Sequence, residues 1–129
     1  MALTMRLKPG ERLILGGVVV RNGEHRATLH VETKATVLRS PDIIRPRDVR
    51  TPCERIVFAL QLLYIEPERA DAHHRSYVKL ARDVRDAAPS FGPQLAKIDA
   101  LLLEGDPYRA LKAGRPLLAL ERRLFDHVR

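Results

Sequence analysis

The stretch PDIIRPRDVRTPCERIVFALQLLYI, residues 41–65, marks a change in the periodicity of the sequence. Its first part contains Pro41, Pro46 and Pro52, and because each lacks a backbone N–H, we expect no regular strand or helix to cross it. Thr51-Pro52 then supplies a helix N-cap and a first-turn proline. The apolar residues that follow recur with the helical period and predict a helix buried on most sides: Ile56, Ala59, Leu60, Leu63 and Tyr64.

Before this stretch, short runs of alternating apolar and polar residues predict about five strands. The first contains Leu3, Met5 and Leu7, and Pro9-Gly10 indicates the turn that ends it. The pair Asn22-Gly23 predicts a hairpin between the third and fourth strands, because both residues tolerate positive φ. The spacing favours a small antiparallel sheet or barrel. The other strands are expected at residues 12–16, 17–21, 25–31 and 34–39.

After this stretch, three more helices are expected, at about residues 68–88, at 92–103 and from Asp106 onward. Pro116 lies inside the apolar pattern of the last helix, and we expect it to kink or split that helix, since proline in a helix interior costs about 3 kcal/mol. The expected fold class is therefore α+β: a small five-stranded antiparallel N-terminal sheet or barrel followed by a bundle of about four helices. We expect a β-rich lobe at residues 1–50 and a helical lobe at 51–129.

The charge of the chain is unevenly distributed. Of the 129 residues, 45% are hydrophobic, which supports a folded core, while 23 Lys and Arg against 16 Asp and Glu give a net charge of +7. Residues 1–50 contain ten basic and five acidic side chains, and residues 51–129 contain thirteen and eleven. A cationic region attracts polyanions and releases counterions when it binds phosphates, although the same charge also serves solubility.

The sequence lacks the features of secreted and membrane proteins. It shows no signal-peptide pattern and no apolar run close to the roughly 20 residues that span a bilayer. A single cysteine excludes an intramolecular disulfide. We therefore expect a cytoplasmic protein that does not bind membranes.

The residues usual in enzyme active sites do not form a recognisable set. His73 and His74 are adjacent, so on a helix they point about 100° apart and cannot chelate one metal ion. Cys53 has no recognisable His or Asn partner, which favours a packed thiol over a nucleophile. Gly16-Gly17 does not match a phosphate-binding loop. We expect no enzyme activity, no catalytic residue, no metal and no cofactor.

The basic side chains of the strand-forming half are the candidates for RNA binding. Arginine pairs with phosphate through two hydrogen bonds and also stacks on bases. The alternative is a solvated sheet face whose charges prevent aggregation. All Phe and Tyr residues lie in the helical half, so recognition through a stacking platform on the sheet is not expected. The candidates are Arg6, Lys8 and Arg39, with Arg12, Arg45 and Arg47 as weaker additions.

Three segments together resemble the FlbT family of bacterial flagellar regulators. They are LKPGERLILGGVVVRNGEHRATLHVETKATVLRSPDII (7–44), TPCERIVFALQLLYIEPE (51–68) and GDPYRALKAGRPLLALE (105–121). This resemblance implies a post-transcriptional regulator of flagellum biogenesis that binds the 5′ untranslated region of flagellin mRNA. It implies a repressor that lowers translation or promotes mRNA degradation, although some members act positively. It also implies a functional counterpart, the flagellar regulator FlaF.

The first half is also similar to the CsrA family of RNA-binding carbon-storage regulators. The similarity rests on Gly10-Glu11 with Leu13, on Asn22-Gly23, and on Val37-x-Arg39 followed by Ile43 or Ile44. It implies five strands that interleave in a homodimer, with RNA bound along the first and last strands. In that arrangement Arg39 takes the place of a basic residue that is critical for RNA binding, and Arg6 and Lys8 match the basic end of the first strand. The sequence departs from that pattern at two positions, Leu7 and Pro41.

Two functional hypotheses follow. The first is an RNA-binding repressor of flagellin synthesis that uses the β-rich lobe. The alternative is a protein-interaction module of flagellar assembly that binds FlaF or flagellin through its helices and does not bind RNA. A hydrolase using Cys53 or His74 is disfavoured because partner residues are missing. The affinity for leader RNA across a salt series separates the first two.

Overall fold

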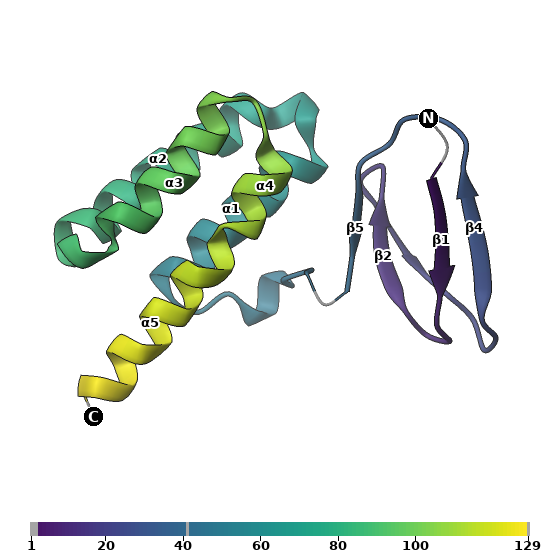
Figure 1. Ribbon diagram of the computed structural model, residues 1–129, viewed down its shortest axis with the longest axis horizontal. Coiled ribbons are helices and arrows are strands. Elements are labelled where there is room, and N and C mark those ends of the chain that lie inside the picture. The colour runs from purple at the N-terminus through teal and green to yellow at the C-terminus, as the bar shows by residue number, and fades with distance from the viewer. Residues whose placement is uncertain (1–2, 41, 129) are drawn as a thin grey trace. The chain divides into compact units, whose positions relative to one another are not determined.

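The computed structural model describes residues 3–40 and 42–128, and the chain divides into two compact units, residues 1–43 and 44–129. Strands form the first unit and helices form the second, as the colours of Figure 1 show along the chain. The expected α+β class, with strands first and a helical bundle second, is confirmed.

The boundary between the units lies earlier than the expected boundary after residue 50. It falls between Ile43 and Ile44, because Ile44 is bonded to the first helix, α1 (Pro52–Ile65). The Ile44 N–H donates to Gln61 Oε1 at 2.8 Å, and Gln61 Nε2 donates to the Ile44 carbonyl oxygen at 2.9 Å. These bonds attach the segment that contains the 3-10 turn η1 (Pro46–Asp48) to the helical unit.

Five strands form two small antiparallel sheets in the strand unit (Figure 1). One sheet pairs β1 (Leu3–Leu7) with β4 (Ala27–Val31). The other has the order β3-β2-β5, with bounds Val18–Arg21, Arg12–Leu15 and Val37–Arg39. All five strands have partners within the same chain, so the interleaved homodimer implied by the CsrA resemblance stays a prediction.

The alternation of apolar and polar residues buries one face of β1, whereas the β3-β2-β5 sheet has buried residues on both faces, with Leu13 on one and Ile14 and Leu38 on the other. Met5 and Leu7 of β1 and Leu13 of β2 form the buried core of this unit, with exposed fractions of 5%, 3% and 0%. Partly buried side chains from β2, β3, β4 and β5 pack against this core: Leu15, Val20, Leu29, Val31 and Val37. Since Met5 and Leu7 point inward, the alternate residues of β1 point outward.

The tight hairpin turn of this unit lies at Gly16-Gly17. There Leu15 pairs with Val18 across two glycines whose φ values are +57° and +84°, a conformation that favours glycine. The hairpin expected at Asn22-Gly23 is wrong, because β3 pairs with β2 and β4 pairs with β1. A short turn sequence alone therefore does not determine which strands pair.

Asn22 has a different structural role. Its side-chain amide donates to the carbonyl oxygens of Leu7, Lys8 and His25 at 3.3, 2.8 and 2.8 Å. In addition, the Gly10 N–H donates to the carbonyl oxygen of Gly23 at 3.0 Å. Residues 22–23 therefore hold the turn that follows β1, which positions the basic residues described below.

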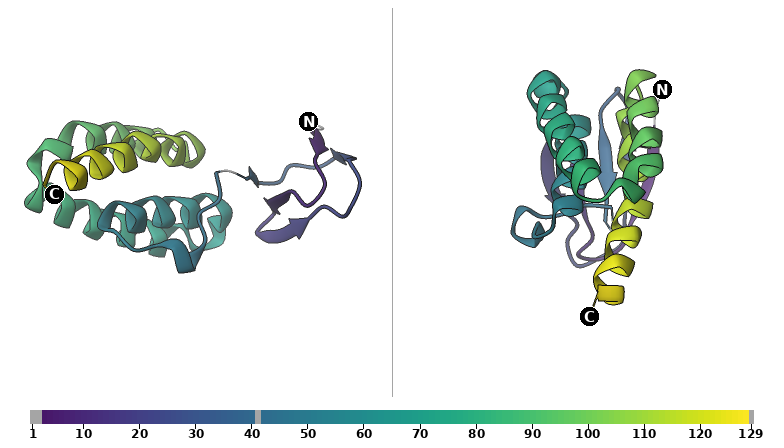
Figure 2. Two further views of the ribbon diagram at one scale, coloured as in Figure 1. Left: turned by 90° about the horizontal axis from the view of Figure 1, so that it is seen from below. Right: turned by 90° about the vertical axis from the view of Figure 1, so that its left-hand side faces the viewer.

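The helical unit begins with a capping box at α1. Thr51 Oγ1 accepts from the Glu54 N–H at 3.1 Å, and Glu54 Oε1 accepts from the Thr51 N–H at 3.0 Å. The helix then packs against α2, α4 and α5, so it is central as predicted. In the left view of Figure 2, α1 and α2 form one layer and the later helices form another. The other bounds are η2 Pro67–Arg69, α2 Ala70–Ala87, η3 Pro89–Phe91, α3 Gly92–Leu103, α4 Pro107–Lys112 and α5 Gly114–Val128.

The last apolar segment is divided at Ala113 into two helices, α4 and α5, which confirms the split predicted from Pro116. Pro116 occupies the first turn of α5, where a backbone N–H has no intrahelical acceptor. Gly114 starts this helix close to α1: a Cβ at this position would lie 2.8 Å from Val57 Cγ2. Within residues 3–40 and 42–128, no helix is both long and apolar enough to cross a bilayer.

Candidate nucleic-acid interface

The outward face of β1 carries one of the predicted residues, Arg6, and a second, Lys8, follows directly after the strand. They alternate with Met5 and Leu7, whose side chains point into the core. Thr28 of β4 lies opposite Arg6, and Arg26 immediately precedes β4. A shallow hollow of about 350 Å³ lies here, lined by Arg6, Leu7, Lys8, Arg26, Ala27 and Thr28. Three cationic side chains therefore surround one depression.

A second hollow of about 640 Å³ adjoins the first, since Lys8 lines both. The turn between β1 and β2 forms its floor, and Arg12 and Arg39 come from β2 and β5. Its lining is Lys8, Pro9, Gly10, Glu11, Arg12, Arg39 and Ser40. We call the five basic side chains that line these two hollows the cationic surface: Arg6, Lys8, Arg12, Arg26 and Arg39.

Arg39 is fixed in this surface by three hydrogen bonds. Its Nη2 donates to Glu11 Oε2 at 2.7 Å and to the Arg6 carbonyl oxygen at 2.8 Å, and its Nε donates to Glu11 Oε2 at 3.1 Å. The side chain is still 40% exposed, so its remaining N–H groups are accessible to a ligand. The hydrogen bond from the Lys8 N–H, together with Arg39, holds the pKa of Glu11 below its usual value.

The other members of the cationic surface have no acidic partner. Among the described residues, no carboxylate forms an ion pair with Arg6, Lys8, Arg12 or Arg26. Arg39 has Glu11, which neutralises one of the five positive charges. A surface with four more cations than carboxylates favours the binding of phosphate groups, because that binding releases condensed counterions.

Arg45 and Arg47 belong to the helical unit, because η1 lies after the unit boundary. Arg45 Nε donates to Asp48 Oδ2 at 2.9 Å, and this ion pair between residues three positions apart neutralises the charge of Arg45. The structure thus gathers Arg6, Lys8, Arg12 and Arg39 in one unit, whereas Arg45 and Arg47 are not part of it. The RNA-binding role of all six stays a prediction.

Arg26 was missed by the reasoning from sequence. It joins the surface because β1 and β4 pair in a register that sets Leu7 opposite Ala27, which places Arg26 beside Lys8. The sequence signal was the period-two pattern of both strands, but that pattern does not specify which strands pair.

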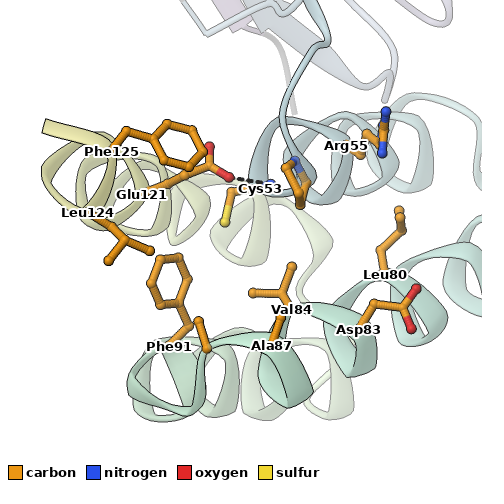
Figure 3. A pocket seen from close by; sticks show the side chains of 12 residues that line it. Cys53, Arg55, Leu80, Asp83, Val84, Ala87, Phe91, Glu121, Leu124 and Phe125 are labelled. Atoms are coloured by element: carbon orange, nitrogen blue, oxygen red, sulfur yellow. Dashed lines mark hydrogen bonds between the residues drawn. The ribbon is translucent and has the colours of Figure 1, made fainter. Parts of the chain in front are cut away.

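The helical unit carries a separate apolar groove, shown in Figure 3. It has a volume of about 430 Å³ and lies between α1, the end of α2 and α5. Val84, Ala87, Phe91, Leu124 and Phe125 supply most of its apolar lining. Leu124 and Phe125 are 40% and 46% exposed, so this groove is open to a partner. We call it the helical groove.

One wall of the helical groove contains Cys53 and Glu121. The Glu121 side chain is buried, and its carboxylate accepts hydrogen bonds from the Thr51 hydroxyl and from the Cys53 N–H at 3.0 Å. This carboxylate therefore caps the start of α1. Burial, with the adjacent Glu121 charge, raises the pKa of the Cys53 thiol to about 12. A thiol that stays protonated at neutral pH is a poor nucleophile, so Cys53 fits the predicted packed thiol.

The histidines provide no metal site in the described part of the chain. His73 Nε2 lies 2.8 Å from Glu66 Oε1, while His74 is exposed on α2. No group of three or more His, Cys, Asp or Glu side chains converges within the described residues.

Comparisons with known proteins point to one family. Residues 3–125 match the family described as "Flagellar protein FlbT". A Bradyrhizobium diazoefficiens protein named "Probable flagellum biosynthesis repressor protein FlbT 1" is 41% identical over 125 residues, covering 96% of this chain and 85% of that protein. The Caulobacter vibrioides "Flagellum biosynthesis repressor protein FlbT" is 31% identical over 130 residues, covering 99% and 92%. No solved structure matches the chain.

Proposed function

The chain belongs to the FlbT family of flagellar proteins, and from this premise we propose that it is a post-transcriptional regulator of flagellum biosynthesis. Its target is the 5′ untranslated region of flagellin mRNA, and its effect is to repress translation and promote degradation of that mRNA. The names of the relatives, which are flagellum biosynthesis repressors, support a regulatory role over an enzymatic one.

The cationic surface is the observation that carries this proposal. Four cations without acidic partners surround two adjoining hollows, together with an arginine that three hydrogen bonds hold in place. Phosphate contacts from such side chains provide most of the affinity for a nucleic acid and set its position. The strand unit has no Phe, Tyr or Trp, so a stacking platform formed by these rings does not contribute.

Single-stranded RNA suits this surface better than a duplex. The deep, narrow major groove of A-form RNA hides its base edges, whereas a single strand or loop exposes them to the free N–H groups of arginine. A protein bound to a flagellin leader represses translation by excluding the ribosome, and the exposed message is then degraded by a cellular nuclease. This mechanism needs no catalytic residue in the protein.

The test is a salt series with purified protein and labelled flagellin leader RNA, with a scrambled RNA of equal length as control. Binding to the leader should be tighter than to the scrambled RNA, and log affinity should fall with log salt with a slope of about −0.7 per phosphate contact. Changing both Arg6 and Lys8 to Gln should reduce that slope by about 1.4. Absent binding, or equal binding of both RNAs, would overturn the proposal.

A second candidate function is supported by the helical groove. Its open apolar lining suits the apolar face of an amphipathic helix, and its two exposed charged side chains, Asp83 and Arg55, offer one contact for a partner charge of each sign. FlaF and flagellin are the partners to test. Titration of each purified protein should give binding that Phe125→Ser weakens and that Arg6→Gln does not. Binding that persists unchanged in Phe125→Ser excludes the groove.

A further inference from the structure

Arg12 and Arg21 lie directly opposite each other in the β2–β3 pair. Residues in this position share one face of an antiparallel pair, with Cβ atoms about 5 Å apart. Both side chains are exposed, and no carboxylate of the described residues pairs with either of them. Like charges directly opposite one another destabilise a strand pair, so this arrangement is unfavourable in the free protein.

Among the described residues, no carboxylate forms an ion pair with Arg12 or Arg21 that would relieve this repulsion. Leu13 lies opposite Arg39 in the β2–β5 pair, so Arg39 and its partner Glu11 are on the other face of the sheet from Arg12. Both oxygens of the Glu11 carboxylate are occupied, one by Arg39 and the other by the Lys8 N–H. The nearest acidic residue in the sequence is thus directed away from Arg12 and Arg21.

We propose that Arg12 and Arg21 form a clamp for one phosphate group of a nucleic-acid backbone. Two guanidinium groups on one face present planar sets of N–H donors that match the oxygens of a phosphate placed between them. The bound anion converts a repulsive pair into two attractive contacts. The cost of the like-charge pair in the free protein is therefore recovered on binding.

The surroundings of the clamp favour a phosphodiester over a free phosphate ion. Val19 lies two residues before Arg21 on the same face and is 67% exposed, which offers an apolar contact for a ribose or a base. Arg12 also lines the hollow that contains Lys8 and Arg39. Because Arg12 belongs to both, the clamp adjoins the cationic surface at β2.

This inference relies on the proposed function only for the identity of the RNA, because phosphate recognition at the clamp does not require a flagellin leader.

Arg21→Gln is the variant that tests the clamp. It should bind leader RNA about 5- to 10-fold more weakly and show a salt slope reduced by about 0.7. Without RNA, it should be at least as stable as the wild type in amide exchange of the strand unit, since the repulsion is gone. Arg21→Lys should keep the slope but lose part of the affinity.

Lys34→Gln is the control, because Lys34 is an exposed cation of the same unit that lies in the loop between β4 and β5, outside both sheets. It should change RNA affinity less than about twofold. Inorganic phosphate and an oligouridylate serve as two further probes. Each should protect strand-unit amides of the wild type more than those of Arg21→Gln, with the oligouridylate effective at far lower concentration.

The outcomes separate the clamp from the flagellin proposal. Wild-type RNA affinity in Arg21→Gln, or a loss no larger than that in Lys34→Gln, would overturn the clamp. Lower stability of free Arg21→Gln would also contradict it, since the pair would then be favourable without an anion. If leader and scrambled RNA bind equally while Arg21→Gln weakens both, the clamp stands and the flagellin-specific function fails.

Discussion

Arg39 of β5 binds the carboxylate of Glu11, 28 residues away, through two hydrogen bonds of 2.7 and 3.1 Å. The same guanidinium donates to the Arg6 carbonyl oxygen at 2.8 Å, and the Glu11 carboxylate also accepts from the Lys8 N–H at 2.9 Å. A residue expected to contact RNA thus also connects β5 to β1 and to the turn that follows it. An alanine substitution at Arg39 alone would therefore mix a structural effect with a binding effect.

Glu11→Gln separates the two roles of Arg39. This variant loses the ion pair but keeps the guanidinium, so it should bind leader RNA as well as the wild type or up to about threefold better. Arg39→Gln removes the guanidinium itself and should weaken RNA binding by about 1–3 kcal/mol if Arg39 contacts a base. Affinity is measured by fluorescence anisotropy, and amide exchange shows whether the strand unit is equally destabilised in both variants. Equal loss of affinity in the two variants would mean that Arg39 acts on structure alone.

The stability of the strand unit should depend on pH through Glu11. Its pKa is lowered from 4.5, first by the Lys8 N–H and then by Arg39, so folding favours the charged carboxylate. Its contribution is fully present above about pH 4.5 and is lost as the pH falls through the lower folded pKa. We expect the stability difference between wild type and Glu11→Gln to be constant near neutral pH and to narrow in acid.

Strand-unit amide exchange is the suitable measurement for this pH series, because every Tyr and Phe lies in the helical unit and aromatic signals follow that unit alone. If the stability difference between the wild type and Glu11→Gln stays constant down to about pH 3, the charge of Glu11 does not stabilise the fold.

Local chemistry made much of the fold predictable from the sequence. The alternation around Met5 and Leu7 predicts the buried face of β1, and Thr51-Pro52 predicts the start of α1, where the structure has a capping box. The split of the last helix follows from Pro116 in the same way. Each of these features depends on residues within a few positions of one another, and so a single sequence contains the information.

Features that depend on distant partners were not predictable. Asn22-Gly23 has the composition of a hairpin turn, but the strands on either side of it belong to different sheets, β3 with β2 and β4 with β1. Arg26 and Arg21 become relevant only when the strand registers are known. Glu121 looks like an ordinary solvated residue of an amphipathic helix, yet it is buried and bonded to Thr51, 70 residues earlier. Tertiary packing, rather than local preference, decides these cases.

Cys53 should be unreactive in the folded protein. Burial and the Glu121 charge raise the pKa of its thiol from 9.0 to about 12, so the thiolate fraction near neutral pH falls about 1000-fold relative to the unfolded chain. Reaction with a disulfide reagent should therefore be at least about 100-fold slower without urea than with it. Because the folded state favours the protonated thiol, this residue should also destabilise the fold as the pH rises above 9.0 toward 12. A rate within about tenfold of that in urea would contradict this environment for Cys53.

Gly114 should tolerate alanine only when Val57 is also reduced in size. A Cβ on Gly114 would lie 2.8 Å from Val57 Cγ2, a buried side chain of α1, so Gly114→Ala forces α5 and α1 apart. Overpacking of this kind costs about 1–3 kcal/mol, which exceeds the gain of up to about 1 kcal/mol from the better helix propensity of alanine. Val57→Ala alone leaves a cavity and is also destabilising. In the double variant the two defects compensate, so its loss of stability should be smaller than the sum of the single losses. Urea unfolding followed by tyrosine near-UV circular dichroism measures all four proteins, and strict additivity would show that α1 and α5 do not meet at this contact.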